Sequence, residues 1–164
     1  MIGGEFPIAV TDILNAQNRH FQAVDVYKYS SGRAALFQIL KFLQKEKNIK
    51  KILLPDYLCS SVLVPVKALG LAYEFYPLDE NLEFEEVEFH NIYERDTAVL
   101  LINYWGLQDL SRQVEYVRNI DEKAIIIEDD VQAYYEFKKP LNSVDFKFTS
   151  LRKTFAVPDG GLVK

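Results

Sequence analysis

Two unbroken apolar runs limit the folds that this chain can adopt. Residues 97–104 read Thr-Ala-Val-Leu-Leu-Ile-Asn-Tyr, and residues 124–127 read Ala-Ile-Ile-Ile before an acidic stretch. A short run that is apolar at successive positions, rather than at alternate ones, is typical of a strand covered on both faces, as in a parallel sheet. The two runs therefore predict central strands of a buried sheet.

The remaining patterns alternate strand with helix. Alternating or apolar runs predict further strands at 24–29, 51–55, 72–76 and 145–149. Apolar residues at helical spacing predict helices within 11–22 and over 33–47, 59–70 and 109–119. The acidic segment 81–95 has no clear period and is predicted to be a solvated surface excursion. Strands that alternate with helices in this way predict an open, mostly parallel α/β sheet.

Size and charge exclude several classes of protein. The chain has 164 residues, which fits one domain, and a formal net charge of −5, which argues against a general nucleic-acid or membrane-surface binder. No apolar run reaches the length of a membrane span, and the first residues lack the basic region and apolar core of a signal peptide. Cys59 is the single cysteine, which excludes an intramolecular disulfide. The cytoplasm is the expected location.

Polar and small side chains follow several of the predicted strands. Ligands bind beyond the carboxyl ends of the strands in an open parallel sheet. These segments are therefore expected to face one crevice: Ser31-Gly32, Asp56-Tyr57, Tyr104-Trp105, Asp129 and the loop 150–153. Ser31 and Gly32 open a helix, where backbone N–H groups, the helix dipole and a hydroxyl can bind an anion. Ser31 is equally compatible with an ordinary helix N-cap.

Asp129 follows three isoleucines and should lie at the edge of a dry sheet. A buried carboxylate needs a partner, which could be a metal ion, a protein cation or the protonated ring nitrogen of a cofactor. A metal is disfavoured because both histidines lie in other segments, and because Glu128 and Asp130 should point away from Asp129 on an extended chain. Neither a GxGxxG sequence after a strand nor a P-loop sequence is present, and no histidine is placed for a Ser-His-Asp hydrolase.

Lys153 lies in a connecting loop between a predicted strand and a Pro-Asp-Gly-Gly turn. A lysine on such a loop can act as an amine nucleophile when burial or a cationic neighbour, here Arg152, suppresses its charge. Lys153 and Arg152 are equally compatible with an ordinary surface pair before a turn. A helix N-terminus for a phosphate, Asp129 for a ring nitrogen and Lys153 for a Schiff base together are the three parts that pyridoxal phosphate requires.

The motifs around these residues resemble those of the DegT/StrS family of sugar aminotransferases, which are pyridoxal-phosphate enzymes of fold type I. Residues 31–36, Ser-Gly-Arg-Ala-Ala-Leu, resemble the family's phosphate loop Ser-Gly-Thr-x-Ala-Leu, with Arg33 in place of threonine. Residues 127–133, Ile-Glu-Asp-Asp-Val-Gln-Ala, resemble its Ile-Glu-Asp-Ala-Ala-Gln-Ala motif. Lys153 and the later Gly160-Gly161 are similar to its Schiff-base lysine and following glycine pair, and residues 2–6 are similar to starts seen in the family.

The resemblance implies a fold and a cofactor. The fold would be the large domain of the PLP-dependent transferases of fold type I, a three-layer α/β/α sandwich with a mixed, mostly parallel sheet of about seven strands. Its last strand, at 161–164, would run antiparallel. The cofactor would be pyridoxal 5'-phosphate, with Lys153 as the internal aldimine and Asp129 paired with the pyridine nitrogen, both in catalytic roles. The other cofactor-binding residues implied are Ser31, Gly32, Arg33, Tyr57, Gln132 and Ser150.

The resemblance leaves two alternatives open at each of two aromatic positions. By strict count Cys59 stands where the family has an aromatic ring over the cofactor, and Tyr57 could stack there if the loop differs. Cys59 itself is otherwise expected to be a small buried residue at the start of a helix. Tyr104 and Trp105 resemble the Tyr-Gly after the family's fourth strand, and they are expected either to line the substrate mouth or to pack in the core.

The implied activity is transfer of an amino group from an amino-acid donor to a keto-sugar-like acceptor, in a homodimer without nucleic-acid, membrane or metal partners. Family members are much longer, so residues 1–164 are expected to form a single pyridoxal-phosphate-binding large domain without the C-terminal small domain. The alternative is a catalytically incomplete remnant that dimerises or binds a partner. A sugar dehydratase is disfavoured, because that branch resembles the family with a histidine in the place of Lys153.

Overall fold

One mixed sheet organises the computed structural model of the chain, whose description covers residues 26–141 and 143–164. Over these residues the sheet has seven strands in the order β1-β7-β6-β5-β4-β2-β3. The strands are β1 (Tyr27–Tyr29), β2 (Lys51–Pro55), β3 (Ala72–Tyr76), β4 (Thr97–Ile102), β5 (Ile125–Asp129), β6 (Phe146–Ser150) and β7 (Gly161–Val163). Strands β2 to β6 pair in parallel, whereas β7 is antiparallel to both β6 and β1. The predicted mixed, mostly parallel sheet with an antiparallel last strand is confirmed.

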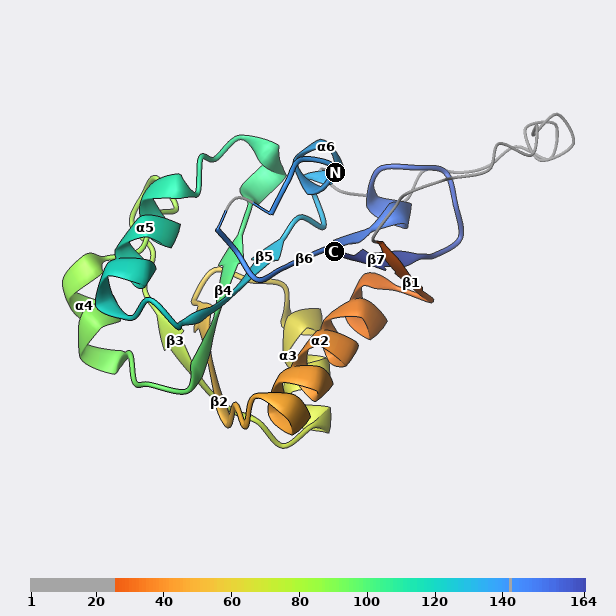
Figure 1. The fold of residues 1–164 in the computed structure, drawn as a ribbon. Helices are drawn as coiled ribbons and strands as arrows, with labels where there is room; N and C mark the ends of the chain where they lie inside the picture. Colours follow the sequence, from red (N-terminus) through yellow and green to blue (C-terminus); the bar gives the residue numbers. More distant parts are fainter. Residues whose placement is uncertain (1–25, 142) are drawn as a thin grey trace, which may run out of the picture.

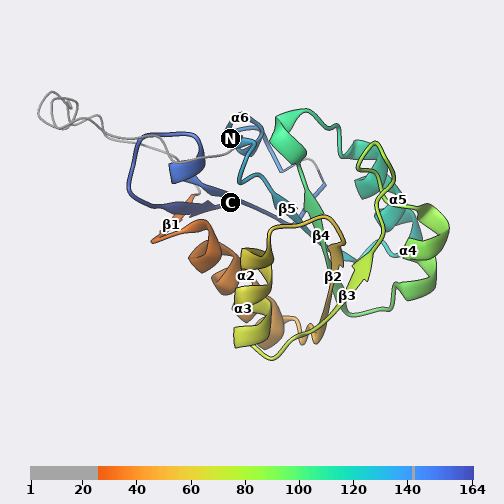
Figure 2. The ribbon, with the colours of Figure 1, turned by 180° about the vertical axis from the view of Figure 1, so that it is seen from behind.

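Helices cover both faces of this sheet (Figures 1 and 2). One face carries α2 (Gly32–Glu46) and α3 (Leu63–Ala68), and the other carries α4 (Glu86–Ile92) and α5 (Ser111–Ile120). The short α6 (Tyr134–Phe137) packs near β6. The result is the predicted three-layer sandwich. The helix predicted within 11–22 and the start of the strand predicted at 24–29 lie outside the described residues.

Successive side chains of the central strands point to opposite faces of the sheet, so each face has its own hydrophobic core. On one face Leu54, Leu100 and Ile127 pack with the apolar stripe of α2, which includes Leu36 and Leu40. These side chains are almost fully removed from solvent. Since each strand is buried on both faces, its sequence is apolar at every position, which is why the runs at 97–102 and 125–127 lack polar alternation.

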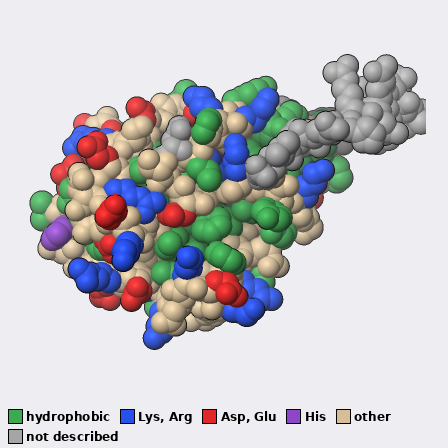
Figure 3. All heavy atoms as spheres, in the orientation of Figure 1, with side chains coloured by type: hydrophobic (Ala, Val, Ile, Leu, Met, Phe, Trp, Pro, Cys, Tyr) green, Lys and Arg blue, Asp and Glu red, His purple; other side chains and the backbone are tan. Residues whose placement is uncertain are grey.

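The second core corrects the prediction of a solvated excursion at 81–95. Phe84 and Phe89 of this segment pack against Val99 and Ile126 on the other face of the sheet, with their rings stacked 4.5 Å apart. The surrounding glutamates obscured a short amphipathic helix, α4, which buries only one narrow stripe. Its outer side stays exposed, and acidic and basic side chains are mixed over the surface around α4 and α5 (Figure 3).

The carboxyl ends of two strands place polar residues at one edge of the sheet. Strands β5 and β6 end at Asp129 and Ser150, so both residues stand at the carboxyl edge of the sheet.

The helix predicted over 59–70 is divided into a 3₁₀ turn at Ser60–Val62 and α3, and it stops before Gly70, whose φ is 64°. None of the helices in the described part of the chain combines the length and apolar character that a membrane-spanning segment requires.

Candidate active site

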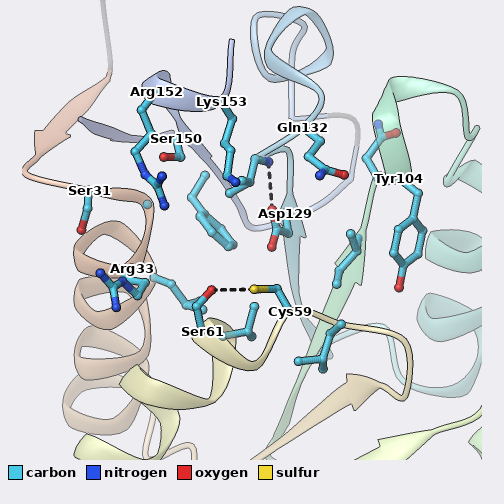
Figure 4. A pocket seen from close by; sticks show the side chains of 18 of the residues that line it. Ser31, Arg33, Cys59, Ser61, Tyr104, Asp129, Gln132, Ser150, Arg152 and Lys153 are labelled. Atoms are coloured by element: carbon cyan, nitrogen blue, oxygen red, sulfur yellow. Dashed lines mark hydrogen bonds between the residues drawn. The ribbon is translucent and has the colours of Figure 1, made fainter. Parts of the chain in front are cut away.

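A pocket of about 560 Å³ lies at the carboxyl edge of the sheet, between the N-terminus of α2 and the loops that follow β2, β4, β5 and β6 (Figure 4). These loops meet because the four strands are parallel to one another. The residues implied as catalytic or cofactor-binding line this pocket: Ser31, Gly32, Arg33, Tyr57, Asp129, Gln132, Ser150 and Lys153. The expectation that Asp56 also faces it is wrong, since Asp56 is not among the lining residues and its Oδ1 accepts a hydrogen bond from Leu78 N instead. The structure therefore brings together residues that are up to 122 positions apart, from Ser31 to Lys153.

The N-terminus of α2 forms one end of the pocket. Ser31 is the N-cap: its backbone is extended, and its Oγ accepts a hydrogen bond from Ala34 N at 3.1 Å. The first N–H groups of a helix have no partner inside the helix, so this end can receive an anion in addition to being capped. The N-cap and anion-site interpretations of Ser31 are thus compatible.

Two glycines allow the chain to approach this helix end closely. A Cβ on Gly32 would lie 2.9 Å from Ser150 Cβ and 3.5 Å from its Oγ. A Cβ on Gly161 would lie 2.1 Å from Ser31 O. Neither position has room for a side chain. The absence of a side chain at Gly32 allows the buried Ser150 to approach the first turn of α2. Its hydroxyl and the helix N–H groups form a polar cradle of hydrogen-bond donors, which is the kind of group that can receive a phosphate.

Asp129 lies at the floor of the pocket with only 6% of its surface exposed. Its Oδ1 accepts a hydrogen bond from Val131 N at 2.8 Å. Burial raises the pKa of its carboxyl to about 7, and the Val131 N–H only partly offsets this rise. A cationic group bound beside Asp129 would favour the ionised carboxylate, so the buried acid fits the protonated ring nitrogen of pyridoxal phosphate.

Replacing Asp129 by asparagine is expected to stabilise the cofactor-free protein at pH 8 while weakening cofactor binding. The pKa of Asp129 is 3.8 in its ordinary state and about 7 when folded, so the folded carboxyl keeps a proton that the unfolded chain has lost. Its contribution to stability is therefore full below pH 4 and falls as the pH rises to 7, by an amount on the order of 4 kcal/mol. Urea unfolding at pH 4 and pH 8 measures this difference. An identical pH dependence in both proteins would contradict the assigned burial.

Lys153 and Arg152 lie on one 3₁₀ turn, Leu151–Lys153, directly after β6. In Figure 4 the side chain of Lys153 extends into the pocket on the side of Asp129, whereas Arg152 extends toward the α2 side. Arg152 Nε is 3.8 Å from Asp159 Oδ1, which ties this turn to the loop before β7. The amine is thus held on a short structured turn inside the cavity, as a nucleophilic or proton-transferring lysine requires.

The structure corrects the expectation that Cys59 is buried. Cys59 is exposed and lines the pocket, because the chain remains extended there and the helical turn begins only at Ser60. Its Sγ lies 3.1 Å from Ser61 Oγ, and hydrogen bonds with Ser61 lower the pKa of the thiol. Tyr57 is 58% exposed and also lines the pocket, so both candidates for the position over a cofactor ring reach the cavity.

Tyr104 and Trp105 both line the pocket but differ in burial. Tyr104 is buried; its hydroxyl donates a hydrogen bond to Tyr57 O, and its ring centroid is 5.7 Å from that of Tyr57. Trp105 is 43% exposed, has a positive φ of 56°, and also lines the pocket. Sequence reasoning missed Ser61 and Asp159 as lining residues, since each stands in a turn without a recognisable motif.

Of the two histidines, the described one, His90, lies apart from this pocket. His90 is exposed on α4, on the opposite side of the sheet from α2, and His20 lies outside the described residues. Among the described residues no cluster of three histidine, cysteine or acidic side chains is arranged to hold a metal. The donor set in the pocket, with an anion cradle, a buried acid and a lysine, fits pyridoxal phosphate.

No protein-family model and no curated protein matches this sequence. Solved structures do match. The sugar aminotransferase CalS13 from Micromonospora echinospora aligns with a TM-score of 0.71 and 19% identity, over 84% of this chain and 41% of that one. Spr1654 from Streptococcus pneumoniae, in its PLP form, aligns with a TM-score of 0.71 and 15% identity, over 85% of this chain and 41% of that one.

The GDP-4-keto-6-deoxy-D-mannose-3-dehydratase of E. coli, with bound hydrated PLP, aligns with a TM-score of 0.66 and 19% identity, over 84% of this chain and 38% of that one. The chain thus spans about two fifths of the length of the structures it matches. Similarity at these identities establishes the fold. The chain has the fold of the PLP-dependent transferases of fold type I.

Proposed function

We propose that this chain is the cofactor-binding large domain of a PLP-dependent aminotransferase that transfers an amino group from an amino acid to a keto-sugar-like acceptor. The observation that carries the proposal is the convergence of Asp129, Lys153 and the N-terminus of α2 on one pocket. The sugar aminotransferase CalS13, which shares the fold, supports the acceptor class.

Four residues at the α2 end would hold the cofactor's phosphate. The N–H groups of Gly32 and Arg33 and the hydroxyls of Ser31 and Ser150 supply donors at this end of the pocket. The guanidinium of Arg33 adds a positive charge where the resemblance has a neutral threonine. These groups would fix one end of the cofactor, so that its ring lies toward Asp129.

The Asp129 carboxylate would accept a hydrogen bond from the protonated ring nitrogen and form an ion pair with it. Gln132, on the adjacent loop, would contact the ring's phenolic oxygen. When bound, pyridoxal phosphate supplies an electron sink for the carbanion that forms at the amino-bearing carbon. Lys153 Nζ would hold the cofactor covalently until an incoming amine displaces it. The freed amine of Lys153 would then take the proton from the substrate carbon and deliver it to the cofactor carbon.

The pocket mouth provides the surfaces that a sugar-like acceptor would meet. Trp105 and Tyr57 present exposed aromatic rings beside the cavity, and such rings can pack against the apolar face of a sugar ring. Leu107 and Tyr135, exposed in the adjoining segments, favour a homodimer that covers this side of the molecule. Lys153 favours amino transfer over sugar dehydration, because the dehydratase branch resembles the family with histidine there.

The test is an absorption spectrum of the purified protein mixed with pyridoxal phosphate, before and after borohydride. The expected result is a visible band that borohydride removes, with the cofactor mass fixed on the peptide that contains Lys153. A folded protein that gives no band would contradict the proposal. In that case the alternative of a catalytically incomplete domain that dimerises or binds a partner would be favoured.

A further inference from the structure

Three charged side chains meet in the protein interior behind Asp129. Glu128 and Asp130 flank Asp129 in the chain, and Lys147 comes from the neighbouring strand β6. All three are buried, and Asp130 has no exposed surface. Because successive residues of an extended chain point to opposite faces, Glu128 and Asp130 point away from the pocket that Asp129 faces. This group is called the back-face triad below.

The ammonium of Lys147 lies close to the carboxylates of both Glu128 and Asp130. Lys147 Nζ lies 2.9 Å from Glu128 Oε2 and 3.8 Å from Asp130 Oδ2. Glu128 and Lys147 stand directly opposite each other in the β5–β6 ladder. The backbone of Asp130 is fastened to the same strand, since its N–H donates to Phe148 O at 2.9 Å and its carbonyl accepts from Thr149 Oγ1 at 2.8 Å.

When all three groups of the back-face triad are ionised, two negative charges face one positive charge. Neither carboxyl oxygen of Asp130 has a hydrogen-bond partner, although both are buried. A buried charge without a full partner is costly. Burial and repulsion from Glu128 raise the pKa of Asp130 to about 8; Lys147 opposes the rise and Asp129 adds to it. Its burial and the nearby Glu128 carboxylate thus favour the protonated form of Asp130.

The triad is almost fully removed from solvent, and none of its three residues lines the pocket. Its effect has to pass through the backbone, and the residue between its two acids is Asp129. We propose that the back-face triad is a positioning device: Glu128, Lys147 and Asp130 fix the end of β5 so that the Asp129 carboxylate stands at the floor of the pocket. The proposal rests on the proposed function only in naming a cofactor as the group that Asp129 meets.

The first test compares Lys147→Met with Val99→Ala. The methionine removes the shared cation and leaves Glu128 and Asp130 buried without it. The alanine opens a gap in the core on the same face of the sheet, away from the pocket, and serves as the control for general loss of stability. Lys147→Met is expected to weaken pyridoxal phosphate binding about tenfold, whereas Val99→Ala should lower the melting temperature without changing the dissociation constant.

A second measurement needs no cofactor and separates failure of this proposal from failure of the proposed function. Carboxyl carbon chemical shifts followed by NMR report the titration of Asp129 in the free protein. Lys147→Met is expected to move the midpoint of this titration by about one pH unit, a tenfold change in proton affinity, and Val99→Ala to leave it in place. Equal midpoints in the Lys147→Met and wild-type proteins would overturn the positioning role.

Asp130→Asn tests the raised pKa of the Asp130 carboxyl. Asparagine keeps the shape of the side chain and can accept from Lys147 while donating to Glu128, so no surplus charge is left. Wild-type stability should fall between pH 5 and pH 8, as the folded state loses the proton that its raised carboxyl pKa retained. In Asp130→Asn this fall should be smaller, with Asp129 contributing the remainder. An unchanged fall would show that Asp130 does not hold the proton.

Discussion

Replacing Lys153 by alanine is expected to abolish covalent attachment of pyridoxal phosphate. Of the groups that line the pocket, the amine of Lys153 is the one proposed to form the reducible bond, and alanine has no nitrogen to replace it. Mass spectrometry after borohydride should find no cofactor on the variant. In a transamination assay of any form of the protein that is active, the rate should fall by about 10³-fold or more, because the proton-transferring group is also lost.

Two controls make this result specific. Lys45→Ala removes a lysine that is 79% exposed on the far end of α2, and it should leave attachment unchanged. Free cofactor should still bind the Lys153→Ala protein reversibly, because the cradle at the N-terminus of α2 and the Asp129 carboxylate remain. Retention of a borohydride-fixed cofactor on Lys153→Ala would remove Lys153 from the proposed function.

Replacing Gly161 by alanine is expected to have the largest effect on stability. The new Cβ would lie 2.1 Å from Ser31 O and 2.9 Å from Gly32 N, both backbone atoms that cannot swing aside. Gly161 is paired with Tyr29 on one side and Ser150 on the other, so β7 cannot shift without breaking two ladders. We expect a loss of about 4 kcal/mol or more in the free energy of unfolding, together with loss of cofactor binding.

Gly70→Ala is the matched control. Gly70 has a positive φ of 64°, but a Cβ there would meet no atom within 4 Å. Its cost is therefore backbone strain alone, about 1–2 kcal/mol. Urea unfolding followed by circular dichroism measures both variants, and soluble yield replaces it if the Gly161 variant does not fold. Equal stability of the two alanine variants would show that the close contact between β7 and α2 does not exist.

The sheet could be predicted from sequence because its strands are buried on both faces. The runs at 97–102 and 125–127 can hardly form anything other than central strands, and the strands predicted at 51–55 and 72–76 have the observed bounds. Once the sheet is parallel, its carboxyl edge follows, and with it the meeting of Asp129 and Lys153 at one pocket. The topology alone predicts this meeting, whereas Arg33 and Gln132 were implied only by the resemblance of their motifs, and Asp56 was wrongly included.

The features that sequence reasoning missed depend on packing between distant segments. Phe89 lies among acidic residues, and only its fit against the sheet makes α4 part of the core. Cys59 is exposed because the helical turn begins one residue later than the pattern suggested. Lys147 stands between two phenylalanines of β6, and nothing local indicates that its charge meets the acids Glu128 and Asp130 at the end of β5.

The contact between Ser31 and Gly161 also bears on when the pocket can form. Strand β1 is hydrogen-bonded to β7 and to no other strand of the described sheet, and α2 starts directly after β1. The anion cradle thus joins parts of the chain that leave the ribosome far apart in time. Contacts of such long sequence separation form late and slowly. We therefore expect the central strands to assemble first, and binding of pyridoxal phosphate to become possible only when β7 has inserted.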